Sequence, residues 1–427
     1  MALQVCIYED DRFAQFYPLT YLRPVYELRP GMAPNFKRIE RQFEGASVSL
    51  LARHQVAPIL AEQVRDYPIN IIKRPSDHDD ILFINGRLRS FGDLPKLISE
   101  SRLNTLFRNN GETVALLLKS ESLDAAPSIA TPADYEKIIA EEHDKETIAD
   151  FDTTATLYNY PWDVMADVEA AVTDDFARVK PSLLKKTGAA VHEHAALVNR
   201  DEIYLGAGVT VMPGAVIDAT GGPVYVGDNT RVESHAAVYG PTYIGPNCVV
   251  VAGKISACSI GHTCRVGGEV EESIFHAYVN KYHAGFIGHS YVGPWVNFGA
   301  MTTNSDLKNN YSPIRCTVNG ESVDSGSIKV GSFIGDHTKT GIGTLLNTGI
   351  SIGVSCNLFG GTLLVDKEIP SFSWGQSGAF VPYKFEKAIE TIERSMERRD
   401  CTLSDRERAQ LRTVFDGVCK AEGALQL

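Results

Sequence analysis

Residues 226–250, VGDNTRVESHAAVYGPTYIGPNCVV, decide the fold of the larger part of this chain. A helix repeats every 3.6 residues and a strand every two, and neither period produces a strict interval of six. A six-residue repeat is typical of a parallel β-helix, in which each hexad forms one flat face of a triangular coil. The residues that set this repeat are Val226, Val232, Val238, Ile244 and Val250.

Small residues follow each of the first four aliphatic ones by four positions. They are Thr230, Ala236, Thr242 and Cys248, and the pairing returns later at Ile260 with Cys264, Ile334 with Thr338 and Ile352 with Cys356. We expect the aliphatic side chain to fill the inside of the coil and the small one to fit its inner corner. The cysteines in this slot are therefore predicted to be packing residues. No CxxC pair indicates a zinc site, and the cysteine spacing favours a reducing compartment.

Composition narrows the class of protein. The chain has 427 residues, enough for two or three domains, with 44% hydrophobic and 22% charged residues, as in ordinary globular proteins. A formal net charge of -12 argues against nucleic acid as a partner. The acidic N-terminus does not resemble a signal peptide, and no window approaches eighteen consecutive apolar residues. We expect a cytoplasmic protein without a membrane partner.

The chain divides into four segments by pattern. Residues 1–150 alternate apolar runs with helix-like stretches, such as 55–65 and 132–142, and predict an α/β domain with a mainly parallel sheet. Residues 151–185 suggest a linker helix, and 186–375 hold the hexads. Residues 376–427 predict two C-terminal helices, the first with apolar residues at helical spacing and the second beginning with a Ser404–Glu407 capping box.

One interruption of the repeat indicates where chemistry could lie. Residues 304–326 are polar and rich in turn formers, and insertions in a solenoid emerge as loops, often on the binding face. Just before them stands KYHAGFIGHSYVGPWVNFGAMTTNSD, residues 281–306.

This stretch, together with VGGEVEESIFHAYVN, IGDHTKTGIGTLLNTG and IPSFSWG, resembles a known family. The family is the bifunctional N-acetylglucosamine-1-phosphate uridylyltransferase/glucosamine-1-phosphate N-acetyltransferase, and a shorter bacterial form of it is more similar. The resemblance implies a left-handed parallel β-helix that trimerises, with acetyl-CoA between neighbouring coils. It places His283 on the catalytic histidine of the frame H-x-x-[YF]-[IL]-G. Asn297, Ala300 and Thr302 also match the family pattern. Asn304 begins an Asn-Ser-Asp that resembles the family's Asn-Tyr-Asp but arrives two residues early.

The residue types suit N-acetylation independently. The amine must lose a proton to attack a thioester, and an imidazole that titrates near neutral pH can accept it. Backbone N–H groups around Gly299 could stabilise the oxyanion. A sugar phosphate requires fixed cations, for which Lys281 and Arg265 are the nearest in sequence. Lys339 could line an acyl-CoA groove. A histidine or lysine on a β-helix can also be an ordinary packed or solvated residue.

The N-terminal domain carries EDDRFAQFYPLTYLRPVYELRPG, residues 9–31, after its first expected strand. This segment is similar to the start of a sugar nucleotidyltransferase, where a loop wraps nucleotide phosphates and basic residues neutralise charge. The nucleotide-binding candidates are Arg12, Arg23, Arg29 and Asn85, the last standing where related enzymes hold magnesium. The loop has no glycine before Gly31, although glycine lets backbone approach phosphate closely. An ion-pair network is the alternative for these arginines.

The resemblance thus implies a transferase in UDP-N-acetylglucosamine biosynthesis. The β-helix would acetylate an amino sugar 1-phosphate, glucosamine-1-phosphate by resemblance, using acetyl-CoA. The N-terminal half would add a nucleotide from UTP with Mg²⁺. The alternatives are that only one activity is retained, or that the protein is a non-catalytic sugar-nucleotide-binding scaffold. No metal ligand is assigned from the sequence.

Overall fold

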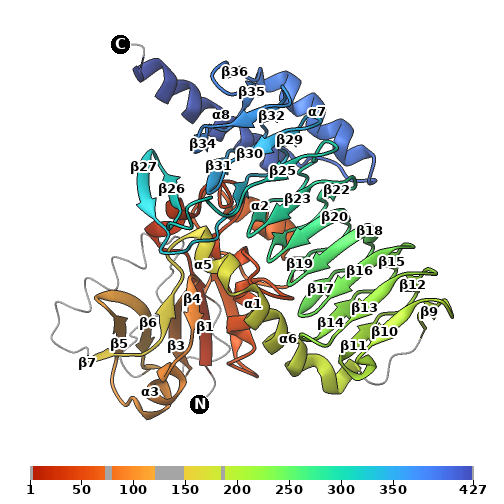
Figure 1. Ribbon diagram of the computed structural model, residues 1–427. Helices are drawn as coiled ribbons and strands as arrows, with labels where there is room; N and C mark the ends of the chain where they lie inside the picture. Colours follow the sequence, from red (N-terminus) through yellow and green to blue (C-terminus); the bar gives the residue numbers. More distant parts are fainter. Residues whose placement is uncertain (1–2, 73–78, 121–148, 184–187, 426–427) are drawn as a thin grey trace. The chain divides into compact units, whose positions relative to one another are not determined.

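The computed structural model describes residues 3–72, 79–120, 149–183 and 188–425, which fall into two compact units (Figure 1). The first unit comprises residues 1–16, 22–28 and 34–160. The second comprises residues 17–21, 29–33 and 161–427. The helix expected at 132–142 lies outside the described residues.

The first unit is built on a mixed six-stranded sheet in the order β2-β1-β3-β6-β5-β7. The three strands β2, β1 and β3 are parallel, while β6 runs antiparallel to β3 and to β5. Their bounds are β1 Leu3–Tyr8, β2 Ser47–Leu51, β3 Asp80–Asn85, β5 Thr105–Asn109, β6 Glu112–Leu118 and β7 Ala149–Asp152, with β4 Leu88–Ser90 pairing β8 Thr156–Leu157. The helices are α1 Asn35–Glu40, α2 Ala57–Gln63 and α3 Leu94–Glu100, with 3-10 turns at Asp11–Phe16 and Val25–Glu27.

The expected division at residue 150 differs from the observed one. Strand β7 pairs with β5, and β8 pairs with β4, so both belong to the first unit. The helical part of the expected linker begins only at Pro161. It consists of α5 (Pro161–Ala166) and α6 (Val168–Leu183), which belong to the second unit.

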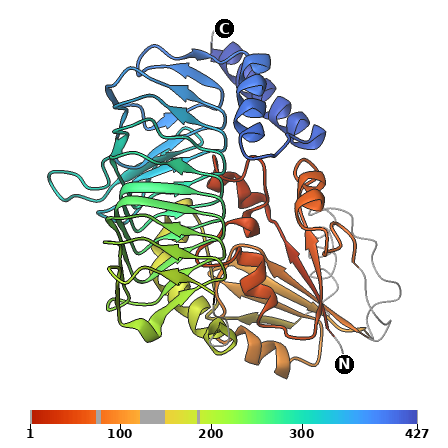
Figure 2. The same ribbon diagram turned by 90° about the vertical axis from the view of Figure 1, so that its right-hand side faces the viewer.

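The second unit is a coil of about ten turns, which Figure 2 shows stacked on one another. Its strands form three faces, and the strands within each face run parallel. Face 1 holds β9 Ala190–Val191, β12 Thr210–Val211, β15 Arg231–Val232, the start of β18 Val249–Ser256 and of β20 Arg265–Glu271, β22 Asn280–Lys281, β29 Lys339–Thr340, β32 Asn357–Leu358 and β35 Ser373–Gly375. Face 2 holds β10 Ala196–Val198, β13 Val216–Asp218, β16 Ala236–Tyr239, the ends of β18 and β20, β23 Phe286–Gly288, β25 Thr303–Asn304, β30 Leu345–Leu346 and β33 Leu363–Leu364. Face 3 holds β11 Ile203–Leu205, β14 Val224–Val226, β17 Thr242–Ile244, β19 Ser259–Ile260, β21 Ile274–Phe275, β24 Tyr291–Val292, β28 Ser332–Ile334, β31 Ile350–Ile352 and β34 Glu368–Ile369.

The aliphatic residues of the hexads fill the inside of the coil, as their spacing predicts. Val226, Val232, Val238, Ile244 and Val250 are all at most 1% exposed and belong to one core. The small slot is equally buried, and there Thr230 Oγ1 accepts a hydrogen bond from the Cys248 N–H of the next turn. Cys248, Cys264 and Cys356 are buried free thiols, which agrees with a packing role.

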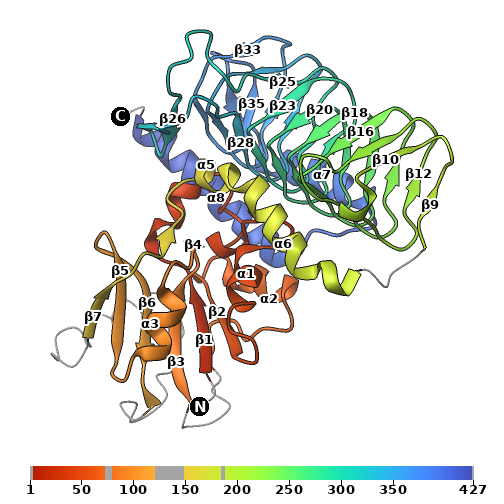
Figure 3. The same ribbon diagram turned by 60° about the horizontal axis from the view of Figure 1, so that its bottom comes forward.

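The remaining elements of the second unit are additions to the three faces of the coil. The interruption contains a hairpin of β26 (Arg315–Val318) and β27 (Glu321–Asp324). Strand β36 (Val381–Pro382) pairs with β35. Helix α6 contacts β17 and lies along the outside of the coil (Figure 3). A 3-10 turn covers Arg200–Glu202.

Two helices, α7 (Phe385–Glu397) and α8 (Asp405–Leu425), follow the coil. The expected buried face of α7 is confirmed, and Ser404 Oγ accepts the Glu407 N–H at 3.1 Å, as the capping box predicts. The expected α/β domain, β-helix and C-terminal helices are therefore all present. Among the described helices, none is long and apolar enough to cross a membrane.

Candidate functional site

His283 lies in the turn between β22 and β23, at the corner that joins faces 1 and 2. Its side chain is exposed, and its ring meets the edge of the Tyr282 ring at a centroid distance of 5.4 Å. Within the described part of the chain, no acidic or carbonyl group contacts the ring nitrogens. An exposed imidazole of this kind can meet a substrate from solvent without any movement of the coil.

Lys281 does not present its ammonium group to the surface. It occupies the aliphatic slot of face 1, aligned with Val266, and is 1% exposed. Its Nζ donates to the carbonyl oxygens of Gly267 at 2.8 Å and His283 at 2.7 Å. Burial lowers the pKa of Lys281 to about 8. This lysine therefore fixes the backbone of the His283 turn and is not placed to bind a sugar phosphate.

Two other candidates from the family pattern are interior residues. Asn304 is 3% exposed, accepts the Gly288 N–H and donates to the Gly288 carbonyl oxygen. Thr302 is fully buried, with its hydroxyl 2.8 Å from that of Thr340. Both side chains connect turns of the coil, so neither faces a substrate.

The backbone near Gly299 also differs from expectation. Its N–H donates to the Thr340 carbonyl oxygen at 3.0 Å, so this group is used within the coil and does not provide an oxyanion donor. Ala300 is half-buried, and its carbonyl oxygen accepts the Gly343 N–H.

His289 is buried at the corner between faces 2 and 3, where its ring lies between two carboxylates. Its Nδ1 is 2.7 Å from Asp306 and its Nε2 is 3.0 Å from Glu272. Burial opposes the charge, but hydrogen bonds and attraction from these two carboxylates raise the pKa of His289 to about 9. A histidine that stays protonated at neutral pH is an unsuitable general base, which favours the structural interpretation of His289.

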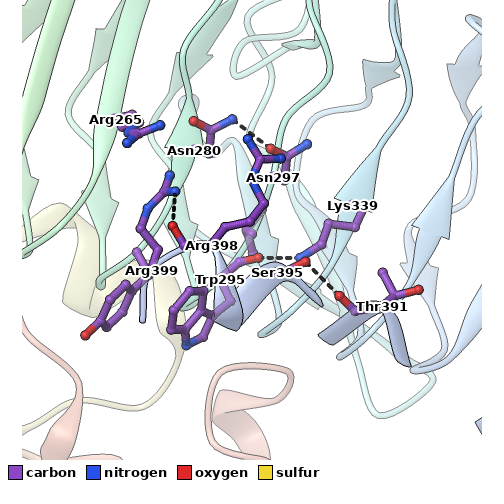
Figure 4. Close-up of a pocket in the computed structure, with 11 residues that line it drawn as sticks. Arg265, Asn280, Trp295, Asn297, Lys339, Thr391, Ser395, Arg398 and Arg399 are labelled. Carbon is purple, nitrogen blue, oxygen red and sulfur yellow. Dashed lines mark hydrogen bonds between the residues drawn. The ribbon is translucent and has the colours of Figure 1, made fainter. Parts of the chain in front are cut away.

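The other three candidates of the β-helix meet in one pocket. Arg265, Asn297 and Lys339 lie at outward positions on successive turns of face 1, connected through Asn280. The pocket has a volume of about 300 Å³, which lies at the lower end of the usual range for small-molecule sites. Its full lining, drawn in Figure 4, is Arg265, Tyr278, Asn280, Trp295, Val296, Asn297, Lys339, Thr391, Ser395, Arg398 and Arg399.

The lining residues that come from α7 and its C-terminal end are not among the candidates expected from the sequence. Arg398 and Arg399 follow α7 directly, and Thr391 and Ser395 lie on it. Only folding brings these residues to face 1, about a hundred positions from Asn280 and Asn297 along the chain. In the sequence, the feature that points to them is the pair of arginines directly after an expected amphipathic helix.

The carboxyl edge of the parallel strands in the first unit is occupied by ion pairs. Asp10 follows β1, and its Oδ2 receives Arg87 Nη2 at 2.7 Å and Asn85 Nδ2 at 2.9 Å. Beside it, Glu9 pairs with Arg53 at 2.5 Å. Ligands of open α/β sheets usually bind at this edge. Here the carboxylate Asp10 is already satisfied by protein donors.

These contacts do not fit a magnesium ion. Asn85 presents its amide N–H₂ to Asp10, and its Oδ1 accepts the Arg87 N–H, so its oxygen is used. Mg²⁺ requires carboxylate oxygens and water in octahedral geometry. Across the described residues, no group of three or more His, Cys, Asp or Glu could hold a metal ion.

The three arginine candidates are separated. Arg12 pairs with Glu112 at 2.7 Å, and Arg23 is 6% exposed. Arg29 belongs to the second unit, where its N–H donates to Tyr291 Oη at 2.9 Å and its side chain to the Met32 carbonyl oxygen. Arg12 agrees with the ion-pair alternative, although its partner is Glu112, outside the acidic residues of the motif.

Comparison with known proteins first concerns the N-terminal part of the chain. Residues 5–182 match the family model of sugar nucleotidyl transferases. The matched residues span most of the first unit together with α5 and α6, so this part of the chain is sugar nucleotidyl transferase-like, and a β-helix follows it.

More particular relatives combine two activities in their names. The chain is 32% identical over 96 residues to the bifunctional sugar-1-phosphate nucleotidylyltransferase/acetyltransferase of Sulfurisphaera tokodaii, covering 22% of this chain and 24% of that protein. It is 32% identical over 139 residues to the bifunctional protein GlmU of Methanococcus vannielii, covering 32% of this chain and 31% of that protein. The matches thus span about a quarter to a third of these relatives. They confirm the expected resemblance to such bifunctional proteins.

A solved structure is also similar in part. The UDP-N-acetylglucosamine acyltransferase from Campylobacter jejuni matches with a TM-score of 0.34 and 14% identity, covering 52% of this chain and 81% of that one.

Proposed function

We propose that this chain is a cytoplasmic, bifunctional transferase that acetylates an amino sugar 1-phosphate and couples the product to a nucleotide. The observation that carries the proposal is the joining of a sugar nucleotidyl transferase domain to a β-helix that presents the motif histidine, His283, to solvent. Glucosamine-1-phosphate, acetyl-CoA and UTP are the proposed substrates. Each is a small molecule, in keeping with an acidic surface that does not attract nucleic acid.

His283 is the proposed general base. Its imidazole takes a proton from the sugar ammonium or amine, and the amine attacks the thioester carbonyl of acetyl-CoA. The tetrahedral intermediate then expels the thiolate of CoA, which leaves with a proton, and an amide remains on the sugar. Lys281 positions the base, because its ammonium group holds the His283 carbonyl oxygen. Asn297, Arg265 and Lys339 are proposed to contact the acyl donor.

The acetylation test follows thiol release from acetyl-CoA with glucosamine-1-phosphate. His283→Ala should lower kcat at least about a hundredfold, the usual contribution of a general base. His192→Ala, which alters an exposed histidine near the start of the coil, is the matched control and should keep full activity. Full activity in folded His283→Ala would exclude this base.

A second candidate is an acetyltransferase whose N-terminal domain no longer transfers nucleotides. It is favoured by the Asp10–Arg87 pair at the strand ends and by the absence of glycine in residues 9–30. Release of pyrophosphate from UTP and N-acetylglucosamine-1-phosphate distinguishes the two. Turnover supports the bifunctional proposal, and no turnover with intact acetylation supports the second candidate.

A further inference from the structure

The pocket between face 1 and α7 concentrates positive charge in an acidic protein. Its lining includes the four basic residues Arg265, Lys339, Arg398 and Arg399 and no acidic residue, although the whole chain carries a net charge of -12. Such a local excess is not explained by general surface charge. It indicates a site that a ligand of opposite sign would complete.

The cations are not neutralised by the protein around them. Arg265 and Arg398 have no ion pair with any described residue, and Arg399 donates to the Arg398 carbonyl oxygen at 3.1 Å. Lys339 Nζ donates to the Trp295 carbonyl oxygen at 2.7 Å. Burial, and then repulsion from the guanidinium groups of Arg265 and Arg398, lower the pKa of Arg399. Mutual repulsion of this kind is relieved when an anion binds.

Neutral groups complete the lining. Asn280 and Asn297 stand side by side, with Asn280 Nδ2 donating to Asn297 Oδ1 at 2.7 Å (Figure 4). Tyr278 and Trp295 form one wall, with rings stacked at 4.0 Å, and both adopt positive φ at the same corner of successive turns. Guanidinium forks, amides and a flat aromatic wall are the groups that recognise phosphate joined to a planar ring.

We propose that this pocket binds the diphosphate of a nucleotide ligand, with the guanidinium groups of Arg265, Arg398 and Arg399 around the phosphates. The ligand's identity rests on the proposed function, whereas the site itself does not. Two sources supply this chemistry, namely the diphosphate of CoA and that of a nucleoside diphosphate sugar. In both, two phosphates adjoin a ribose and a base.

Binding of inorganic pyrophosphate to the full chain, measured by calorimetry, tests the site without any turnover. Arg265→Gln and Arg399→Gln should each weaken binding about tenfold or more, because each removes charged hydrogen bonds. Arg265→Lys, which keeps the charge but loses the planar fork, should lie between these variants and wild type.

Two matched controls sit outside the pocket. Arg231→Gln alters the same outward column of face 1, where Arg231 pairs with Glu233, and Arg394→Gln alters the same helix, where Arg394 pairs with Glu390. Both should bind pyrophosphate like wild type. Absence of pyrophosphate binding in the wild type, or equal loss in pocket and control variants, would overturn the proposal.

Competition then separates the two sources. Displacement of pyrophosphate by CoA, but not by UDP-N-acetylglucosamine, supports the site as part of the acyl-donor groove. The reverse result supports it as a sugar-nucleotide site, and displacement by neither overturns the nucleotide assignment. His283→Ala should bind pyrophosphate normally, so loss of acetylation and loss of this site are distinguishable.

Discussion

At the scale of single residues, two buried basic side chains of the coil, those of His289 and Lys281, are contacted by chemically different groups. His289 lies between two carboxylates, whereas Lys281 has only carbonyl oxygens around its ammonium group. Carboxylates stabilise the proton on His289 and burial weakens it on Lys281, so their pKa values move in opposite directions from the ordinary ones. Two buried basic residues of the same turn thus have pKa values shifted in opposite directions.

His289 should make stability depend on pH. Its folded pKa of about 9 lies above the unfolded value, so its contribution is complete below about pH 6.5 and is lost as pH rises through 9. The contribution is on the order of 3 kcal/mol. Urea unfolding of wild type and His289→Gln should differ most at pH 6 and converge toward pH 9.5. A difference that is constant with pH would contradict the charged state, and exposed His192→Gln is the control.

Lys339 should couple anion binding to protonation. Burial lowers the pKa of Lys339 to about 7, and its side chain lines the same pocket as Arg265, Arg398 and Arg399. A bound anion favours the protonated amine, so pyrophosphate affinity should rise as pH falls from 8.5 to 6.5. Lys339→Gln should lose this part of the pH dependence. Pyrophosphate itself titrates in this range, so the comparison is between variant and wild type at each pH.

At the scale of elements, α7 joins the C-terminal segment to the coil. Its buried side chains, Ala388, Ile389, Ile392 and Met396 among them, hold the helix so that Arg398 and Arg399 reach face 1. The pocket therefore depends on packing of an apolar helix face as much as on its cations.

Ile392→Ala tests that dependence. The side chain is 1% exposed, so its truncation should cost about 2–5 kcal/mol of local packing and loosen α7. Pyrophosphate binding should weaken while the strand signal in circular dichroism stays. Glu397→Ala, at an exposed position of the same helix, should have no effect. Unchanged binding in Ile392→Ala would show that α7 does not form the pocket.

At the scale of the whole molecule, the coil has an apolar surface near His283. Ile342 stands at the same corner two turns along and is 75% exposed. Leu345 and Leu363 pair on face 2 at 41% and 45% exposure. Exposed apolar patches mark interaction sites. We propose that this surface is the homotrimer interface and that a neighbouring copy covers the exposed base.

Ile342→Glu should therefore disrupt the proposed trimer. A charge in an apolar interface is costly unless it is paired. Light scattering should report three copies for wild type and fewer for the variant, with acetylation lost in parallel. A monomeric wild type would contradict the trimer, and Arg231→Gln is a control distant in turn number.

The sequence by itself determined the coil, because a strict six-residue period allows one regular structure and the same phase fixes which side chains are interior. The same phase also predicts that three of the candidate residues are interior. Lys281 stands six after Phe275, Asn304 six after Phe298, and Thr302 four after Phe298. These are interior or corner slots, and the structure places all three side chains inside.

Only the tertiary structure decided which residues line the pocket and which ion pairs form at the carboxyl ends of the strands in the first unit. Arg398 and Arg399 meet Arg265 because α7 packs back on face 1, and no local pattern encodes that contact. Likewise Asp10 is satisfied by Arg87, 77 positions later, because β1 and β3 are adjacent strands. Periodicity records which way a side chain points along one segment, whereas the meeting of distant charges depends on how whole elements pack.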